Sequence, residues 1–294
     1  MEKVIINSIE EYIREVINLN SNNFFNSVAD CITVYRGQSN SEWKIIPAVF
    51  RDLDDYLNEG LYLKEFQRQF PEECNNLTLF DILVKAQHYG IPTRLLDLTL
   101  NPLIALYFAC EKNFDNDGSV YVFCDRALFG QETIPCEIVV NYLFKCKKNV
   151  SWNNQDALKI CRILNINPDI TITLTDNEVN KILSDKLEHL FISPKLTNNR
   201  IKAQKGVFSL MNVPLGENKK SFLFPQKDIE ISLKPSKTLI IPKNLKEEIM
   251  FNLSILGVDR YALFPELDSS AVNIVNKIKS TNMGAYRRTC KNIF

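Results

Sequence analysis

Four polar residues stand where a charged or titrating side chain could bind a ligand. Arg36 ends the apolar run "CITVYRGQ", His88 closes an apolar segment, and Arg94 and Asp97 follow shortly after it. The planar fork of arginine bonds carboxylates and phosphates in bidentate fashion, so Arg36 is either the partner of an internal carboxylate or aimed at an anion. Histidine titrates close to neutral pH, and the chain has two of them. The pattern therefore predicts an anion site with a titrating or hydrogen-bonding histidine.

Arg94 and Asp97 also have an interpretation that needs no ligand. An unmatched buried charge is costly, so the two could form an internal ion pair that pins the turn between them. Thr93 or Asp97 could at the same time bond backbone amides. His88 could likewise be a satisfied, partly buried side chain. The sequence leaves these alternatives open.

Two predicted helices enclose this polar segment. Residues 77–90 carry apolar side chains at helical spacing and end at a glycine and a proline. Residues 96–110 contain a second helix start, with Asn101 as the cap and Pro102 in the first turn. The His-Tyr-Gly turn, the Pro-Thr-Arg stretch and Asp97 are therefore expected between two apolar helices.

The remaining pattern predicts an α+β fold, a single domain whose central mixed or antiparallel sheet is flanked by helices. Strands at both ends of the chain are expected to share that sheet. Residues 133–200 are rich in asparagine, and we expect helices there near 155–164 and 177–191. The other predicted strands are "SVADCITVYRGQ", 118–129, 206–213, 229–234, 237–242 and a short piece from 261. The other predicted helices begin at Ser8 (a capping box with Glu11), at residue 52, at Asn244 (a cap with Glu247) and after residue 265.

Composition excludes several classes of protein. The 35 basic and 35 acidic side chains cancel, so the chain lacks the positive field of a non-specific nucleic-acid binder. Eight cysteines occur without a CxxC pair, which is typical of reduced thiols in a cytoplasmic protein, and no metal site is expected. No run approaches the ~18 apolar residues of a membrane span, and the first residues do not resemble a secretory signal.

Three stretches together resemble the FRG domain, a bacterial and phage-associated family named after a Phe/Tyr-Arg-Gly strand end. They are "YRGQSNSEWKIIPAVFR" from residue 35, "QHYGIPTRLLDLTLNPLIALYFA" from residue 87, and "ALFPELDSSAVNIV" from residue 262. The resemblance runs from about residue 30 to 280, so we expect one FRG-type domain over 1–294, with 133–200 as a family-specific helical insertion. Tyr35 replaces the naming Phe, and Leu98 stands where the family usually has Trp.

A second resemblance concerns the chemistry. "TVYRGQ" is similar to the first conserved strand of ADP-ribosyltransferases of the Arg-Ser-Glu class, which place an arginine early, polar residues on a middle strand and a catalytic glutamate late. Arg36, Ser209 and Glu266 follow that order here. The Ser-Thr-Ser triplet of that class is missing. Phe264 stands where transferases that modify arginine have Glu or Gln, which makes arginine an unlikely acceptor. Without this resemblance, Glu266 could be a helix N-terminal carboxylate of no function.

The resemblance implies an NAD-using enzyme, with NAD as substrate. Cleavage of the bond between nicotinamide and ribose builds positive charge on the ribose, which a carboxylate stabilises. An arginine would bind the phosphates and an aromatic ring such as Tyr89 would stack on nicotinamide or adenine. The implied roles are catalytic for Glu266, Arg36 and His88, cofactor-binding for Arg36, Gln38, Tyr89, Arg94 and Ser209, and supporting for Asp97, Arg51 and Trp43.

The expected biology is that of a toxin or anti-phage defence effector that modifies a protein or nucleic-acid acceptor. A neutralising antitoxin or regulatory partner would then accompany it. Two alternatives stay open: an NAD glycohydrolase, and a non-catalytic module that senses a nucleotide or another anion. The transferase hypothesis requires that Arg36 and Glu266 face one cleft, and convergence with His88 and Tyr89 would strengthen it.

Overall fold

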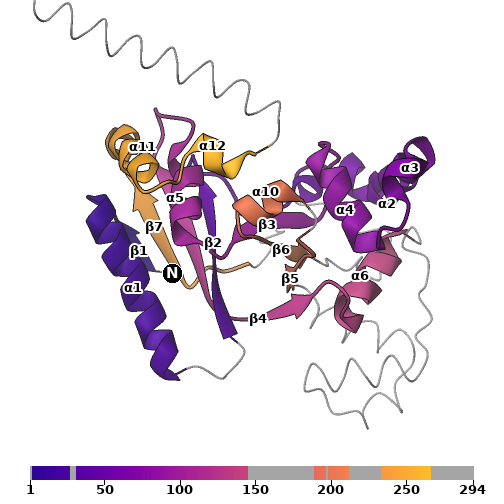
Figure 1. Ribbon diagram of the computed structural model, residues 1–294, viewed down its shortest axis with the longest axis horizontal. Helices are drawn as coiled ribbons and strands as arrows, with labels where there is room; N and C mark the ends of the chain where they lie inside the picture. Colours follow the sequence, from indigo (N-terminus) through magenta and orange to yellow (C-terminus); the bar gives the residue numbers. More distant parts are fainter. Residues whose placement is uncertain (1, 27–30, 145–188, 197, 212–232, 266–294) are drawn as a thin grey trace, which may run out of the picture.

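The computed structural model describes residues 2–26, 31–144, 189–196, 198–211 and 233–265, which form a mixed sheet flanked by helices (Figure 1). The predicted α+β class is thereby confirmed. None of the helices in these ranges is long and apolar enough to cross a membrane. The helices are α1 (Ile9–Asn26), α2 (Leu53–Gln69), α3 (Pro71–Cys74), α4 (Leu79–His88), α5 (Pro102–Cys110), α6 (Ile134–Phe144), α10 (Asn199–Ala203), α11 (Lys246–Ile255) and α12 (Arg260–Leu263), with 3-10 turns η1 (Ala48–Phe50) and η2 (Lys243–Leu245).

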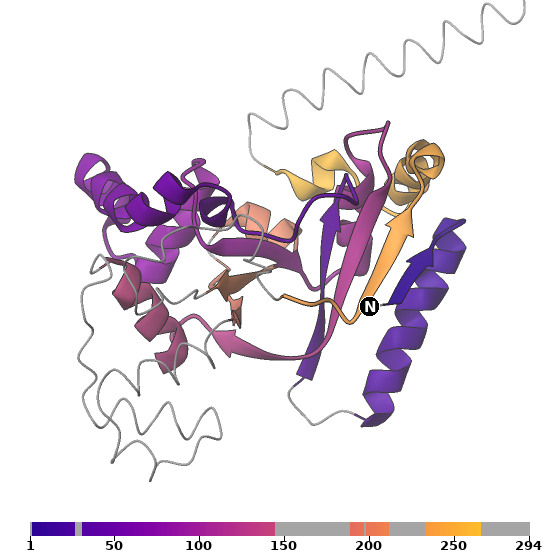
Figure 2. The same ribbon diagram turned by 180° about the vertical axis from the view of Figure 1, so that it is seen from behind.

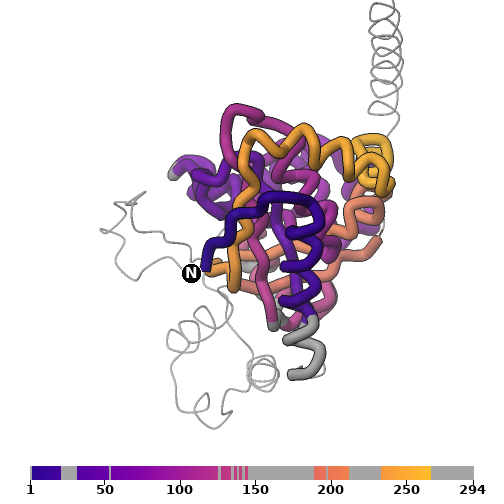
Figure 3. The backbone as a smooth tube through the Cα atoms, turned by 90° about the vertical axis from the view of Figure 1, so that its left-hand side faces the viewer, coloured from indigo at the N-terminus to yellow at the C-terminus, as the bar shows by residue number. Residues whose placement is uncertain are grey.

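The described residues contribute seven strands to the sheet, in the order β1-β7-β4-β2-β3-β6-β5. The pairs β1–β7 and β4–β5 are parallel, and the other neighbours are antiparallel. The pairing of β1 with β7 confirms that strands from distant parts of the chain share the sheet, and Figure 3 shows these two segments side by side. The strands are β1 (Glu2–Ile5), β2 (Cys31–Gln38), β3 (Leu95–Thr99), β4 (Gly118–Gly130), β5 (His189–Ser193), β6 (Gly206–Met211) and β7 (Lys237–Ile241).

Strand β4 is long enough to close part of the sheet on itself. Its first residues pair with β2 and β7, and its last three pair with β5. The pairings of β4, β2, β3, β6 and β5 therefore form a closed circuit. One hydrophobic cluster draws on all five of these strands, with η1 and Tyr56 of α2 packed against it. Val34 belongs to this cluster, so the side of β2 that carries Val34 faces this interior.

Two further hydrophobic clusters attach the helices. In one, α1, α5 and α11 pack against β1, β4 and β7, and these elements lie together in Figures 1 and 2. In the other, α2, α4 and α6 pack against β5 and β6 at the opposite end of the molecule. The end of α5 and the segment that contains η1 thus both reach the carboxyl end of β2, from the two sides of the sheet.

The helix starts follow the local sequence closely. Thr78 and Asp81 form a capping box at the start of α4, and the Asn101 side chain accepts from the Leu103 amide at the start of α5, where Pro102 occupies the first turn. Ser8 accepts from the Glu11 amide at α1. The predicted Asn101 and Ser8 caps are confirmed, but the Glu11 carboxylate accepts from the Asn7 amide, where a capping box would use the Ser8 amide.

Several predicted elements differ from the structure. The stretch 95–99 is strand β3, which the sequence analysis did not predict; its five residues are too few to show a period, and its partner β6 is over 100 residues away. Residues 189–193 are strand β5, where a helix was expected to reach 191. The predicted Asn244 cap is wrong because Pro242 starts a 3-10 turn, and the chain at 260–263 is a helical turn rather than a strand. The expected helices at 155–164 and after 265, and most of the expected strand at 229–234, lie outside the described residues.

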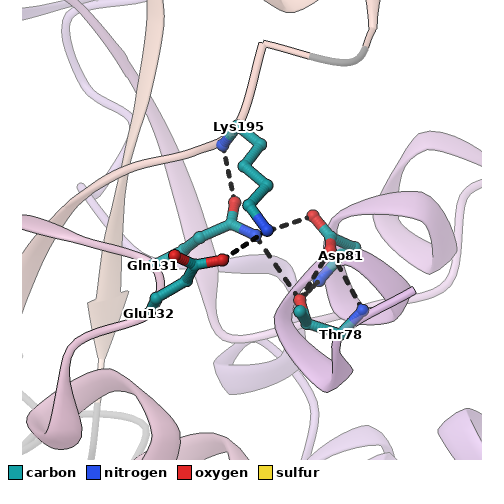
Figure 4. Close-up of polar contacts among 5 residues, drawn as sticks. All are labelled: Thr78, Asp81, Gln131, Glu132 and Lys195. Atoms are coloured by element: carbon teal, nitrogen blue, oxygen red, sulfur yellow. Dashed lines mark hydrogen bonds and ion pairs between the residues drawn. The ribbon is translucent and has the colours of Figure 1, made fainter. Parts of the chain in front are cut away.

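A polar cluster at the end of β4 joins three segments (Figure 4). The side-chain nitrogen of Gln131 donates to the carboxylate of Asp81 in the α4 cap at 3.0 Å, and the side-chain oxygen of Gln131 accepts from the backbone amide of Lys195 at 2.6 Å. Lys195 also forms an ion pair with Glu132. Because Gln131 is buried, these bonds replace those that it would make to water. The cluster anchors α4, and with it the polar segment that follows α4, to the sheet.

Candidate functional site

A cavity of about 600 Å³ lies at the carboxyl end of β2, and we call it the β2 cavity. Its volume is within the range of small-molecule sites. Three segments line it: the end of β2, the stretch that leads through η1, and the end of α5. Its charged lining side chains are Arg36, Lys44, Arg51, Glu111 and Lys112, and its aromatic ones are Trp43, Phe50 and Phe108. Four cations and one carboxylate give the cavity a field that favours an anion, and the rings offer stacking surfaces.

Alternation along β2 points Arg36 and Gln38 to the same side of the strand. Gly37 faces the other side, where α5 packs directly against the strand. A Cβ atom at Gly37 would lie 1.8 Å from the Ala105 carbonyl oxygen and 2.8 Å from the Ala109 nitrogen, both in the backbone of α5. Only glycine allows this contact, and the contact brings the end of α5 beside the end of β2.

Arg36 and Gln38 each present an unpaired polar atom. The Arg36 Nη1 group donates to the Asp97 backbone oxygen at 2.6 Å, but its buried Nε has no hydrogen-bond partner among the described residues. Gln38 is 5% exposed; its amide nitrogen is 3.4 Å from the Lys44 carbonyl oxygen, and its buried Oε1 has no partner in the same part of the chain. A buried donor or acceptor without a partner costs about 1–3 kcal/mol.

Arg51 brings a second guanidinium to the cavity. Its Nε and Nη2 lie 3.4 and 3.2 Å from the Ile46 carbonyl oxygen. Burial lowers the pKa of Arg36, the Asp97 carboxylate opposes that change, and the Arg51 cation lowers the pKa of Arg36 further. An anion bound between the two guanidinium groups would relieve their repulsion. Trp43, which is 51% exposed, stands at the edge of the same site.

Buried Lys246 holds two walls of the cavity together. Its ammonium group donates to the backbone oxygens of Ser39 at 2.7 Å, Lys112 at 3.1 Å and Asn113 at 3.0 Å. The Asn113 side chain also donates to the Ser39 hydroxyl at 2.7 Å. Burial lowers the pKa of Lys246. Since Ser39 and Lys112 both line the cavity, Lys246 fixes the end of β2 against the end of α5.

Glu111 is a cavity residue that the sequence did not single out. Glu111 directly follows the last residue of α5, and its side chain is 12% exposed. Burial raises the pKa of Glu111, and the cations of Lys112, Arg260 and Arg200 oppose that rise. One feature of the sequence could have pointed to Glu111: it is the first charged residue after the apolar helix that begins in the second FRG-like stretch.

The late FRG-like stretch reaches the cavity wall. The Phe264 ring packs edge-on against Phe108, with centroids 6.3 Å apart. The guanidinium carbons of Arg200 and Arg260 lie 5.0 and 5.2 Å from the centroid of the Phe264 ring. Glu266 itself lies outside the described residues, so the expectation that it shares a cleft with Arg36 stays a prediction.

Comparison with protein-family models identifies this part of the chain. Residues 32–118 match the model of the FRG domain. The chain carries an FRG domain. The match begins in β2 and ends at the start of β4, so every residue that lines the β2 cavity lies within it. No curated protein and no solved structure matches the chain.

The second FRG stretch builds the frame of the site. The Gln87 amide donates to the Asp97 carboxylate at 2.9 Å, and the Thr93 hydroxyl donates to the Gln87 side-chain oxygen. Asp97 in turn offers its backbone oxygen to Arg36. Asp97 therefore supports Arg36 through the main chain, while its exposed carboxylate belongs to the turn.

His88 and Tyr89 of the FRG domain do not line the β2 cavity. Both are exposed at the end of α4, and Tyr89 is 64% exposed. Their rings contact each other, with centroids 5.3 Å apart, and Tyr89 also contacts Phe66 of α2. Among the described residues, the structure therefore does not bring His88 and Tyr89 together with Arg36 at the cavity.

Arg94 of the FRG domain is buried in an ion pair with Glu59 of α2. Its Nη2 lies 2.6 Å from Glu59 Oε2, and its Nε lies 3.2 and 3.1 Å from the two carboxylate oxygens. Its backbone amide donates to the same carboxylate. The partner is thus Glu59 instead of the Asp97 considered from sequence. Glu59 engages Nε and Nη2 of Arg94, while its buried Nη1 has no partner among the described residues. Arg94 does not line the cavity; its guanidinium carbon lies 5.8 Å from the ring centroid of Phe50, which does.

Ser209 is buried in β6 and does not line the cavity. Its side of the strand also carries Val207 and Met211 of the five-strand cluster. The Ser209 hydroxyl has no hydrogen-bond partner among the described residues. Over those same residues, the histidine, cysteine and acidic side chains form no group that could hold a metal ion.

Proposed function

We propose that this FRG-domain protein binds NAD in the β2 cavity and cleaves the bond between nicotinamide and ribose. The observation that carries the proposal is the lining of the cavity, which combines four cations with three aromatic rings. The cations favour an anionic ligand, and the rings favour one that carries planar bases. A dinucleotide has phosphates for the guanidinium groups and amide or hydroxyl donors for Gln38.

The lining residues support distinct parts of this ligand. Arg36 and Arg51 bind the phosphates, since both guanidinium groups line the cavity. Phe50, Phe108 and Trp43 supply ring faces for the bases. The resemblance to ADP-ribosyltransferases assigns the carboxylate that stabilises the ribosyl cation to Glu266. The contact of Phe264 with Phe108 supports that assignment, because Glu266 follows Phe264 by two residues.

The proposed product depends on the acceptor. Transfer of ADP-ribose to a protein or nucleic acid would make the protein an ADP-ribosyltransferase, and transfer to water would make it an NAD glycohydrolase. Either activity fits a toxin or anti-phage effector that a partner protein neutralises. Induced expression should then arrest growth, and the Arg36→Lys variant should not.

The test measures binding and turnover separately. Calorimetry with NAD reports binding, and chromatography reports free nicotinamide, with and without cell lysate as a source of acceptors. Arg36→Lys keeps the charge but loses the bidentate fork, so affinity should fall by about tenfold or more. Arg68→Lys is the matched control, because Arg68 is exposed and paired with Glu65 on α2. Glu266→Gln should retain binding and lose nicotinamide release.

Two results would contradict this proposal. If NAD neither binds nor releases nicotinamide, the cavity serves another ligand. If NAD binds equally well to wild type and Glu266→Gln and neither releases nicotinamide, the protein is the non-catalytic nucleotide-sensing module that the same cationic cavity also supports.

A further inference from the structure

We propose that Glu111 recognises the adenosine ribose of the ligand and excludes nucleotides that carry a 2′-phosphate. This inference rests on the proposed binding of a nucleotide in the β2 cavity. Among the described residues that line the cavity, Glu111 is the only carboxylate. It is nearly buried at the end of α5, whose position against β2 is fixed by the contact at Gly37.

The Glu111 carboxylate keeps acceptor capacity for a ligand. Its ion-pair partner among the described residues is Lys112, whose Nζ lies 3.7 Å from Oε1, beyond the usual range of a hydrogen bond. An ionised carboxylate offers about four acceptor positions on its two oxygens. Burial raises the pKa of Glu111, although the cations of Lys112, Arg260 and Arg200 oppose that rise. A pair of neighbouring hydroxyl donors would satisfy this group better than its present surroundings do.

An aromatic ring stands beside this carboxylate. Phe108 precedes Glu111 by three residues, so the two side chains lie on the same face of the helix end, and both line the cavity. A ring face next to a carboxylate suits a nucleoside, because the base stacks while its ribose hydroxyls donate. An acidic side chain that accepts from a ribose hydroxyl is a known means of nucleotide recognition.

The same carboxylate would repel a 2′-phosphate. Two like charges a few ångströms apart repel strongly in a partly buried site. Lys112 cannot compensate fully while it is paired with Glu111. Without the Glu111 charge, Lys112 would be available to the phosphate. The choice between a ribose hydroxyl and a 2′-phosphate therefore depends on a single side chain.

Three nucleotides test this inference without any turnover: ADP, 2′-deoxy-ADP and adenosine 2′,5′-bisphosphate. Calorimetry on the wild-type full chain should show ADP binding about tenfold tighter than either of the others, as expected for a hydrogen bond to a charged group. Glu111→Gln should bind ADP about tenfold more weakly and the bisphosphate more tightly than wild type does. Glu42→Gln is the matched control, because it makes the same change of charge at an exposed residue next to Trp43.

The outcomes separate this inference from the proposed function. If wild type binds ADP but the ratios among the three nucleotides are the same in Glu111→Gln, the role of Glu111 is refuted while nucleotide binding stands. If Glu42→Gln changes the ratios as much as Glu111→Gln does, the effect is one of net charge and the role is refuted too. If no nucleotide binds to wild type, both proposals fail. Circular dichroism of each variant establishes that it is folded.

Discussion

The buried ion pair between Arg94 and Glu59 permits a quantitative prediction for Arg94→Met. Methionine fills a similar volume but leaves Glu59 without its cation in a fully buried position. Of the four hydrogen bonds between Arg94 and the Glu59 carboxylate, three come from the guanidinium and one from the backbone amide, which alone would remain. Removing one member of a buried pair costs about 3–5 kcal/mol. Since domains are stable by about 5–15 kcal/mol, this is a large part of the total.

Urea unfolding followed by circular dichroism measures the loss. Arg94→Met should lower the unfolding free energy by about 3–5 kcal/mol. The double variant Glu59→Leu with Arg94→Met should recover most of it, because the uncompensated charge is gone. Arg68→Met, in an exposed pair, should change stability by less than about 1 kcal/mol.

A particular result would refute this reasoning about Arg94. If Arg94→Met unfolds within about 1 kcal/mol of wild type and instead loses nucleotide affinity, then Arg94 contacts the ligand as the family resemblance implied. If stability falls and nucleotide affinity of the folded variant at low temperature is unchanged, the role is structural. The two measurements therefore separate the interpretations that the sequence left open.

Three further predictions follow from single residues. Gly37→Ala would push a methyl group into the α5 backbone, so the variant should be insoluble or should melt well below wild type in a thermal scan. Lys246→Met removes the three hydrogen bonds that the buried ammonium group donates to backbone oxygens; it should lower the unfolding free energy by about 2–4 kcal/mol and weaken nucleotide binding, because Ser39 and Lys112 lose their link. Glu111→Gln should stabilise the protein at neutral pH. The pKa of Glu111 in the folded state is raised above 4.5, so ionisation of the carboxylate destabilises the folded wild type. In urea titrations, the extra stability of the variant should therefore appear as pH rises above 4.5 and level off above the folded-state pKa.

The predicted site residues that the structure brings together at the β2 cavity are those positioned by local geometry. Arg36 and Gln38 are two apart on one strand, so strand alternation alone puts them on one side. Trp43 and Arg51 follow within a short loop and line the same cavity. The Ser8 and Asn101 caps are also local, since each bond spans two or three residues.

The residues for which sequence and structure differ depend on contacts between distant parts of the chain. The partner of Arg94 lies 35 residues earlier on α2, and nothing in the spacing favours Glu59 over Asp97. His88 and Tyr89 were expected at the cleft because the sequence placed them at a helix end. The structure confirms that they end α4 but leaves both outside the lining of the β2 cavity. Glu111 was missed for the opposite reason, since only the approach of α5 to Gly37 brings it to the cavity.

The FRG match therefore contains two sets of polar residues with different tasks. The side chains of Gln87, Thr93 and Asp97 form hydrogen bonds with one another, and the backbone oxygen of Asp97 accepts from Arg36. Arg36 and Gln38 line the cavity, and each has a buried polar atom without a partner among the described residues. A frame whose polar groups are satisfied internally supports a site whose polar groups are not, and burial makes unpaired groups costly unless something binds them. That contrast, more than any single motif, is the reason to look for a ligand at the end of β2.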